Sequence, residues 1–330
     1  MSALKLSVAM GNYDRVQALV DHSVGIDGVD PVFMLLPPEE MMFRALKNHE
    51  FDVTELSLSG YAVSLTKESP PYIGIPVFLS RAFRHASFYV RNDKEINDPE
   101  SLKGRRIGIS EFQSTANVWA RAILEDEYGV KTSDIHWVRG KLNVPGLTAD
   151  LANRLPPGVQ ADIAPDDRSL DDLLRSGDID GFVGPKPPAC FDADHPKVER
   201  LFKDSTTMAC DYFRRTRIFP IMHLLGVRTE LANAHPWLPF ALFKAFNTAK
   251  NKALDALGDT STPKVSLPFV DEQLMTARHL MGRDFWPNGI DGNREGLATF
   301  LKHHHRQGLS DRQLGVEELF HPNTLNPFKL

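Results

Sequence analysis

Cysteine is scarce in this 330-residue chain, in which Cys190 and Cys210 are the whole complement. Two cysteines cannot build the disulfide framework of a small secreted domain. Cysteines that are not in disulfides are usually buried thiols. We therefore expect two buried thiols and no oxidising compartment, which favours a cytoplasmic protein.

Long hydrophobic runs are also missing, and no stretch approaches the roughly 18 uninterrupted apolar residues of a membrane helix. The N-terminal segment MSALKLSVAMGNYDR has no basic region followed by a long apolar one, so it does not read as a signal peptide. Apolar residues alternate from Leu4 to Met10, which predicts a first β-strand. We expect no membrane partner.

Neither sign of charge dominates, because 38 Lys and Arg stand against 43 Asp and Glu, for a formal net charge of -5. Without a basic field, nucleic acid is not an expected partner. The motifs of nucleotide-binding loops, serine hydrolases and zinc proteases are missing. Three neighbouring histidines, His303 to His305, lie about 100° apart on a helix and cannot converge on one ion. We expect a solvated helix face there and no metal site.

What the sequence does contain is an alternation of strand and helix patterns over residues 4 to 66, which predicts a parallel sheet flanked by helices. The length predicts two lobes. We expect the chain to cross between them near RHASFYVR and near FRRTRIFPIMH. Residues 1–87 and 213–330 then form lobe 1, residues 88–212 form lobe 2, and a ligand cleft lies between them.

Two strand-like runs carry polar side chains that need a reason. RIFPIMHLLGVR contains His223, and IPVFLSRAFRHASFYVR contains Arg81, Arg84 and His85. On a strand, Arg81 and His85 share one face and Arg84 lies on the other. A buried arginine needs an anion, and its guanidinium matches a carboxylate through two parallel hydrogen bonds. The run indicates an anionic ligand, with local carboxylate partners as the alternative.

Two strand-to-helix junctions add hydroxyl groups. EFQSTANVW places Ser114 and Thr115 at a helix start, which suits a carboxylate, although ordinary N-capping is the alternative. ELSLSGY places Glu55 and Ser59 at a second junction. His223 is the best acid/base candidate because imidazole titrates near neutrality, and a structural histidine is the alternative.

The segments FDVTELSLSGY, PPYIGIPVFLSRAFRHASFYVR, DPESLKGRRIGISEFQSTANVWARAILEDEYGV and RIFPIMHLLGVR together resemble the 4,5-dihydroxyphthalate decarboxylase family. The resemblance runs in order over nearly the whole chain, and SRAFRH and IFPIMH are its most specific parts. It implies an α/β fold like that of type II periplasmic binding proteins. In that fold each of two lobes is a mainly parallel sheet flanked by helices, and two crossover strands join the lobes.

The resemblance also implies a function: a carboxy-lyase of phthalate catabolism that needs no cofactor. The substrate it implies is a hydroxylated benzene dicarboxylate, foremost 4,5-dihydroxyphthalate, which would give protocatechuate and CO2. The main alternative is a non-catalytic solute-binding protein for an aromatic or other small carboxylate. The apolar C-terminal helices are compatible with a homodimer.

The predicted site roles follow from charge and predicted position under this resemblance. His223 or His85 donates the proton, and the other histidine or Glu55 polarises the phenol. Arg81 and Arg84 hold the retained carboxylate. The remaining predicted binding residues are Ser114, Thr115, Ser59, Tyr13 and Arg15. Gly226, Gly181 and Gly184 interrupt strands, and either region could widen the cleft for a related ring acid.

Overall fold

The structure, a computed structural model, describes residues 3–67, 69–146, 155–259 and 261–325. The chain divides into two compact units. Unit 1 comprises Met1–Arg81, Ile221–Leu297 and Leu314–Leu330, and unit 2 comprises Ala82–Pro220 and Ala298–Gln313. The sequence-based division, after residues 87 and 212, lies close to the first two boundaries but assigned residues 298–313 to the other lobe.

Unit 1 is built on a five-stranded sheet in the order β2-β1-β3-β11-β4. The first three strands are parallel, and β11 runs antiparallel to both of its neighbours. The expected alternation of strands and helices is confirmed at the start of the chain. The strands are β1 (Leu4–Met10), β2 (Val29–Leu35), β3 (Val53–Ser57), β4 (Tyr72–Arg81) and β11 (Ile221–Arg228).

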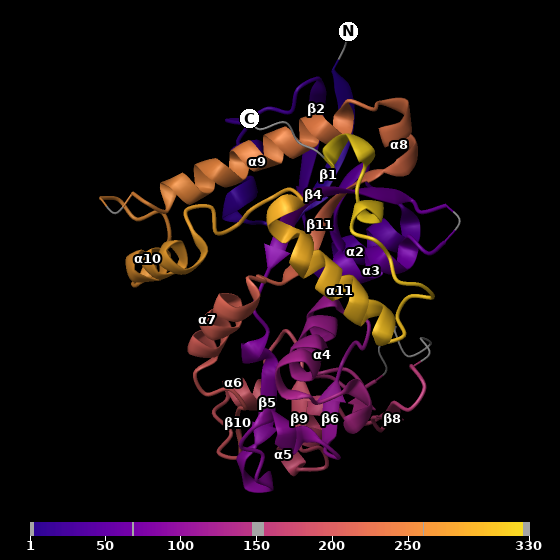
Figure 1. The fold of residues 1–330 in the computed structure, drawn as a ribbon, viewed down its shortest axis with the longest axis vertical. Coiled ribbons are helices and arrows are strands. Elements are labelled where there is room, and N and C mark those ends of the chain that lie inside the picture. The colour runs from indigo at the N-terminus through magenta and orange to yellow at the C-terminus, as the bar shows by residue number, and fades with distance from the viewer. Residues whose placement is uncertain (1–2, 68, 147–154, 260, 326–330) are drawn as a thin grey trace. The chain divides into compact units, whose positions relative to one another are not determined.

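Helices cover this sheet, and the longest of them, α9, lies across it and provides much of the core (Figure 1). Leu242 and Phe246 of α9 are fully buried with Val8 and Leu225 of the strands. Removing such side chains from water is the main favourable term in folding. The helices are α1 (Gln17–Val20), α2 (Pro38–Asn48), α3 (Leu58–Ser64), α8 (Thr229–Ala234), α9 (Leu238–Ala256) and α10 (Val270–Met281).

Unit 2 is built on a six-stranded sheet in the order β10-β5-β9-β6-β7-β8. Four of its strands, β9, β6, β7 and β8, are parallel, and β5 is antiparallel to both β10 and β9. Its elements are β5 (Phe88–Arg91), β6 (Arg106–Ile109), α4 (Thr115–Tyr128), β7 (His136–Arg139), β8 (Gln160–Ile163), α5 (Leu170–Ser176), β9 (Gly181–Val183), α6 (Ala189–Asp192), β10 (Val198–Arg200) and α7 (Ser205–Thr216).

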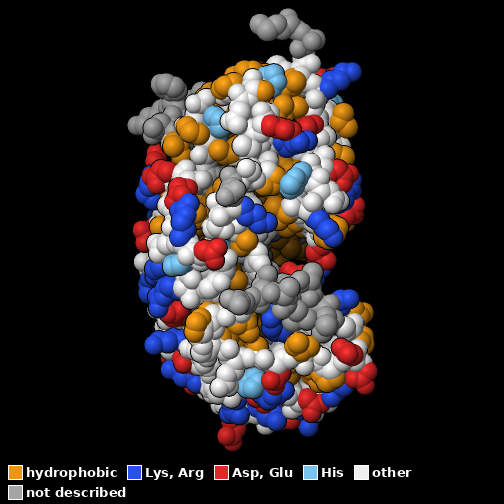
Figure 2. Space-filling view, turned by 90° about the vertical axis from the view of Figure 1, so that its right-hand side faces the viewer, with side chains coloured by type: hydrophobic (Ala, Val, Ile, Leu, Met, Phe, Trp, Pro, Cys, Tyr) orange, Lys and Arg blue, Asp and Glu red, His pale blue; other side chains and the backbone are white. Residues whose placement is uncertain are grey.

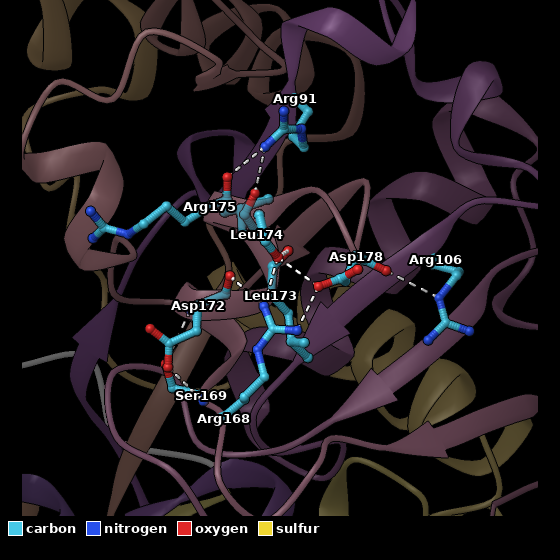
Figure 3. A network of polar contacts seen from close by, with 10 residues as sticks. Arg91, Arg106, Arg168, Ser169, Asp172, Leu173, Leu174, Arg175 and Asp178 are labelled. Carbon is cyan, nitrogen blue, oxygen red and sulfur yellow. Dashed lines mark hydrogen bonds and ion pairs between the residues drawn. The ribbon is translucent and has the colours of Figure 1, made fainter.

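The short helix α5 shows how side chains complete a helix at both ends (Figure 3). At its start Ser169 accepts from the backbone N–H of Asp172, whose carboxylate accepts from the Ser169 N–H in return. At its end the buried Arg91 guanidinium donates to the carbonyls of Leu174 and Arg175, both at 2.9 Å. These carbonyls have no partner within the helix, so the arginine replaces water there.

Two predicted strands are shorter than their sequences suggested. β4 ends at Arg81, and His85 lies instead in a 3-10 turn over His85–Ser87. The expectation that Arg81 and His85 share one strand face was therefore wrong. β11 begins only at Ile221, because Arg217 ends α7 with a φ of 57° and Pro220 has no N–H to donate to a ladder.

The three neighbouring histidines lie in α11 (Arg294–Arg306), and the expectation of a solvated face was wrong. His303 and His304 are buried, with exposed fractions of 0% and 1%. His303 Nε2 lies 2.7 Å from Asp126 Oδ2 on α4, and His304 Nδ1 lies 3.1 Å from Ser310 Oγ. One ring nitrogen of each histidine has a polar partner inside unit 2, which helps this half of the helix to be buried.

The surface carries both signs of charge. On the face shown in Figure 2, Lys and Arg side chains are interspersed with Asp and Glu, and neither sign forms a continuous field over the atoms that are not grey. Among the described helices, none is both long enough and apolar enough to cross a membrane.

Candidate active site

The candidate active site in unit 1 is centred on Glu55, a carboxylate with an exposed fraction of 0% in the interior strand β3. Strand pairing places it. Glu55 lies opposite Leu225 of β11, and His223 lies two residues before Leu225 in the same strand. Side chains two apart on a strand share a face, so His223 and Glu55 are diagonal neighbours on one side of the sheet.

Three hydrogen bonds converge on the Glu55 carboxylate. Oε2 accepts from the backbone N–H of Gly11 at 2.9 Å. Oε1 accepts from the Tyr13 hydroxyl at 2.9 Å and lies 2.6 Å from His223 Nδ1. The donors come from two segments, because Gly11 and Tyr13 follow β1 and His223 belongs to β11.

These donors keep the buried carboxylate ionised. Burial by itself raises the pKa of Glu55, but the hydrogen bond and charge of His223 and the donors Gly11 and Tyr13 outweigh it, so the pKa lies below its usual value. The same burial and the charge of Glu55 raise the pKa of the Tyr13 phenol. Tyr13 therefore stays a neutral donor at neutral pH.

The ionised carboxylate fixes the state of the His223 ring. A carboxylate only accepts hydrogen bonds, so Nδ1 of His223 must carry a hydrogen. The His223 side chain remains 19% exposed, and no described residue forms a hydrogen bond with its Nε2. A carboxylate behind one ring nitrogen stabilises the imidazolium, while the other nitrogen can exchange a proton with a ligand.

An irregularity in the sheet lies at His223. The pairing of β11 with β4 shifts register on both sides of this residue, whereas its pairing with β3 continues without a break. Such bulges re-aim side chains and are common beside active sites. No sequence pattern predicted this bulge.

Arg15 lies beside the Glu55 cluster, which we define as Glu55 with Gly11, Tyr13 and His223. Two aromatic rings contact the guanidinium group of Arg15. Its guanidinium carbon lies 4.0 Å from the centre of the Tyr13 ring and 4.5 Å from that of Trp286. Its Nε and Nη2 both donate to the Leu79 carbonyl. Burial lowers the pKa of Arg15, although nearby negative groups such as Asp14 oppose this. Tyr13 and Arg15 were predicted from the sequence as binding residues, whereas Gly11 and Trp286 were not.

The serines of the predicted junction lie at the start of α3. Ser57 is its N-cap, accepting from the N–H of Gly60 at 3.4 Å, so the predicted strand-to-helix junction is confirmed. Ser59 lies within the helix with an exposed fraction of 0%. Its binding role stays a prediction.

Arg81 is buried in unit 1 with protein acceptors of its own. Its Nη2 donates to the Pro287 carbonyl at 2.6 Å and to Asn293 Oδ1, and its guanidinium lies over the Phe78 ring. Burial lowers its pKa to about 9. The arginine therefore remains charged at neutral pH, and part of its hydrogen-bonding capacity is used within the fold.

Arg84 and His85 belong to unit 2 and differ from each other. The Arg84 side chain forms no hydrogen bond or ion pair with the described residues, and burial lowers its pKa to about 10. His85 is 1% exposed, and its ring packs 5.6 Å from Phe202 and 5.5 Å from Tyr212. Burial, with a smaller effect of Arg215, lowers its pKa to about 4. This burial favours His223 over His85 as the proton donor.

The second junction, also in unit 2, is confirmed as a helix start. Ser114 is the N-cap of α4 and accepts from the N–H of Asn117 at 3.4 Å, and Thr115 follows with an exposed fraction of 3%. Among the residues described, no three His, Cys, Asp or Glu side chains are grouped to hold a metal ion. Cys190 and Cys210 are free, the first buried and the second half-buried.

Two solved structures of sulphonate-binding proteins have a similar fold. The periplasmic aliphatic sulphonate binding protein SsuA of Escherichia coli matches with a TM-score of 0.56 and 14% identity, covering 100% of this chain and 96% of that one. The alkanesulfonate-binding protein SsuA of Xanthomonas axonopodis pv. citri matches with a TM-score of 0.52 and 12% identity, covering 97% and 99%. The predicted two-lobe fold of the type II periplasmic binding proteins is confirmed.

Curated relatives are much closer in sequence, although no family model matches the chain. A 4,5-dihydroxyphthalate decarboxylase of Pseudomonas putida is 48% identical over 214 residues, which cover 65% of this chain and 83% of that one. A 4,5-dihydroxyphthalate decarboxylase of Comamonas testosteroni is 53% identical over 330 residues, the whole of both chains. Identity at that level over the full length confirms the resemblance found in the sequence: the chain belongs to the 4,5-dihydroxyphthalate decarboxylase family.

Proposed function

We propose that this protein converts 4,5-dihydroxyphthalate to protocatechuate and CO2 without a cofactor. Full-length identity of 53% with a 4,5-dihydroxyphthalate decarboxylase supports the substrate. The single structural observation that carries the proposal is the hydrogen bond of 2.6 Å between buried Glu55 and partly exposed His223. It provides an acid/base group of the kind that this reaction requires.

The reaction needs a proton at one ring carbon. Each carboxylate of the substrate is para to a hydroxyl, so deprotonating or hydrogen-bonding that hydroxyl moves electron density toward the carbon that bears the carboxylate. A proton adds to this carbon, the bond to the carboxylate breaks, and CO2 leaves. The electron pair of the broken bond restores the aromatic ring, which therefore serves as its own electron reservoir.

His223 is the proposed proton donor, acting through Nε2. Glu55 holds Nδ1, keeps the ring oriented and stabilises the positive charge before the proton is given up. Tyr13 and Gly11 hold Glu55 in turn. Arg84 is the preferred clamp for the retained carboxylate, because its side chain carries a charge and forms no hydrogen bond or ion pair with the described residues. Ser114, Thr115, Ser59, Arg15 and Arg81 remain predicted binding residues.

We also propose that the enzyme is cytoplasmic, acts on a small aromatic dicarboxylate and forms a homodimer. The free thiols of Cys190 and Cys210 support a reducing compartment. Light scattering of the purified protein measures the mass in solution, and a monomer would remove the dimer from the proposal.

The test is turnover by chelator-treated protein, followed by chromatography of the ring products and measurement of CO2. The His223→Gln variant should bind substrate but turn it over about 10²–10⁴-fold more slowly, the usual loss for an acid/base group. His279→Gln, which changes an exposed histidine of α10, is the matched control and should keep full activity. Tight binding without turnover by the wild type would favour a solute-binding protein, and full activity of His223→Gln would place the proton donor elsewhere.

A further inference from the structure

Gly11, the first residue after β1, touches the Glu55 cluster in two ways. Its N–H donates to Glu55 Oε2 at 2.9 Å. Its bare Cα also lies under the phenol ring of Tyr13. A Cβ built at Gly11 would lie 2.6 Å from Cε2 and 2.5 Å from the hydroxyl oxygen of that ring, and closer still to Cζ. Real Cβ atoms do not approach other atoms so closely, so alanine here would displace the ring.

The need for glycine at this position is steric. The backbone of Gly11 has no positive φ, so alanine could adopt the same conformation without strain. Gly11 is buried, and the three atoms nearest to its added Cβ all belong to the Tyr13 ring. What alanine would change is therefore the position of the phenol, and with it the hydrogen bond of 2.9 Å from the Tyr13 hydroxyl to Glu55 Oε1.

We propose that Gly11 is a positioning residue of the decarboxylation, because its missing side chain lets Tyr13 fold back and hold Glu55 against His223. This inference rests on the proposed function. Gly11 and Tyr13 each donate to the carboxylate that orients His223, and neither forms a hydrogen bond with His223 itself, so they act through Glu55.

The titratable and charged groups around Glu55 determine how its pKa would change if the Tyr13 phenol were displaced. They are His223 on β11, and Tyr13 and Arg15 in the segment that follows β1. The Tyr13 hydroxyl is one of the donors that lower the pKa of Glu55, so losing it raises that pKa. A higher pH is then needed to ionise the carboxylate, and the acid limb of the activity profile moves up.

The experiment compares Gly11→Ala with Gly25→Ala. A Cβ at Gly25 meets nothing within 4 Å, so this control changes glycine to alanine without a steric contact. Gly11→Ala should lower kcat roughly tenfold, the factor expected for one hydrogen bond to a charged group. It should move the acid limb of kcat/KM up by roughly one pH unit and leave KM nearly unchanged. Gly25→Ala should match the wild type in all three.

A second background tests whether Gly11 acts through Tyr13. In Tyr13→Ala the ring is gone, so adding Gly11→Ala should cost no further activity. An equal loss in both backgrounds would overturn the proposal, as would wild-type kinetics of Gly11→Ala. If Gly11→Ala fails to fold, the double variant should fold again and match Tyr13→Ala. Failure to fold in both backgrounds would also overturn the proposal.

A measurement without substrate separates this inference from the proposed function. The proton between His223 Nδ1 and Glu55 should give a far-downfield NMR signal that disappears in His223→Gln. Gly11→Ala should shift or broaden that signal, and Gly25→Ala should not. If the wild type does not decarboxylate 4,5-dihydroxyphthalate but the signal responds in this way, the geometry holds and the substrate is wrong. An NMR signal that is unchanged in Gly11→Ala would overturn the positioning role of Gly11, whatever the substrate.

Discussion

Arg81 and Arg84 stand three positions apart and have different surroundings. Arg81 is 7% exposed and donates to the Pro287 carbonyl and Asn293, so its charge helps to hold unit 1 together. The Arg84 side chain has no hydrogen-bond or ion-pair partner among the described residues, so its charge is available to an anion. The sequence presents both as arginines in one apolar run, and only the surroundings distinguish them.

We therefore expect the same substitution, arginine to lysine, to have different effects at the two positions. Arg81→Lys should lower the free energy of unfolding in urea by about 1.5–3 kcal/mol, because lysine cannot reproduce both hydrogen bonds. Arg84→Lys should change it by less than about 0.5 kcal/mol and raise KM instead. Each variant is the control for the other. An unchanged KM in Arg84→Lys would remove that residue from the proposed clamp.

His85 predicts an acid-sensitive contribution to stability. Its pKa is lowered from 6.5 to about 4 in the fold, so the folded protein holds it neutral. Below the unfolded value the unfolded state binds more protons, so stability is full above pH 6.5 and falls between pH 6.5 and 4. His85→Gln should lose less unfolding free energy than the wild type between pH 7 and 4.5, measured by urea titration. Parallel losses would contradict a depressed pKa at His85.

At the level of elements, β11 shows what periodicity can and cannot predict. Its apolar residues predicted a buried strand, and a strand is found at Ile221–Arg228. Its antiparallel place between β3 and β4 could not be read from this pattern, because both partners are far away in sequence. Glu55 and His223 could therefore each be predicted as candidate residues, but the hydrogen bond between them could not be predicted. Gly11 and Trp286 had no signal at all.

Gly226 in this strand has a packing role. It pairs with Gly74 of β4, and a Cβ there would lie 3.2 Å from Cγ of the fully buried Leu56 and closer still to its Cδ1. Gly226→Ala should therefore lower the free energy of unfolding by about 1–3 kcal/mol through overpacking. Denaturant unfolding beside Gly25→Ala checks this. If Gly226→Ala is as stable as that control but alters substrate preference, the earlier idea of a widened cleft would be favoured.

At the scale of the whole molecule, each unit is assembled from separate stretches of chain. The sequence indicated two lobes and two crossings, because strand and helix patterns resume after each. It gave no sign that Ala298–Gln313 belongs to unit 2, since a helix that runs from one unit into the other has an unbroken pattern. Burial of His303 beside Asp126 follows from that membership.

Because Phe300 belongs to unit 2, we expect its substitution to destabilise that unit. Its ring is 0% exposed and lies 5.5 Å from that of Trp119 on α4. Phe300→Ala should cost about 3–5 kcal/mol through the cavity it leaves. Hydrogen exchange should show lost protection in α4, over Thr115–Tyr128. Loss confined to β1 through β4 would contradict the assignment of this segment to unit 2.

The place of β11 between β3 and β4 also has a consequence for synthesis on the ribosome. Glu55 and His223 are 168 positions apart. At about 5–20 residues per second, roughly ten to thirty seconds pass between their translation. During that time β3 and β4 lack the strand that joins them, and their open edges can pair with other chains. Unit 2 in turn waits for residues 298–313. Unit 1 therefore cannot be completed before β11 is synthesised, and unit 2 cannot be completed before Ala298–Gln313 has followed.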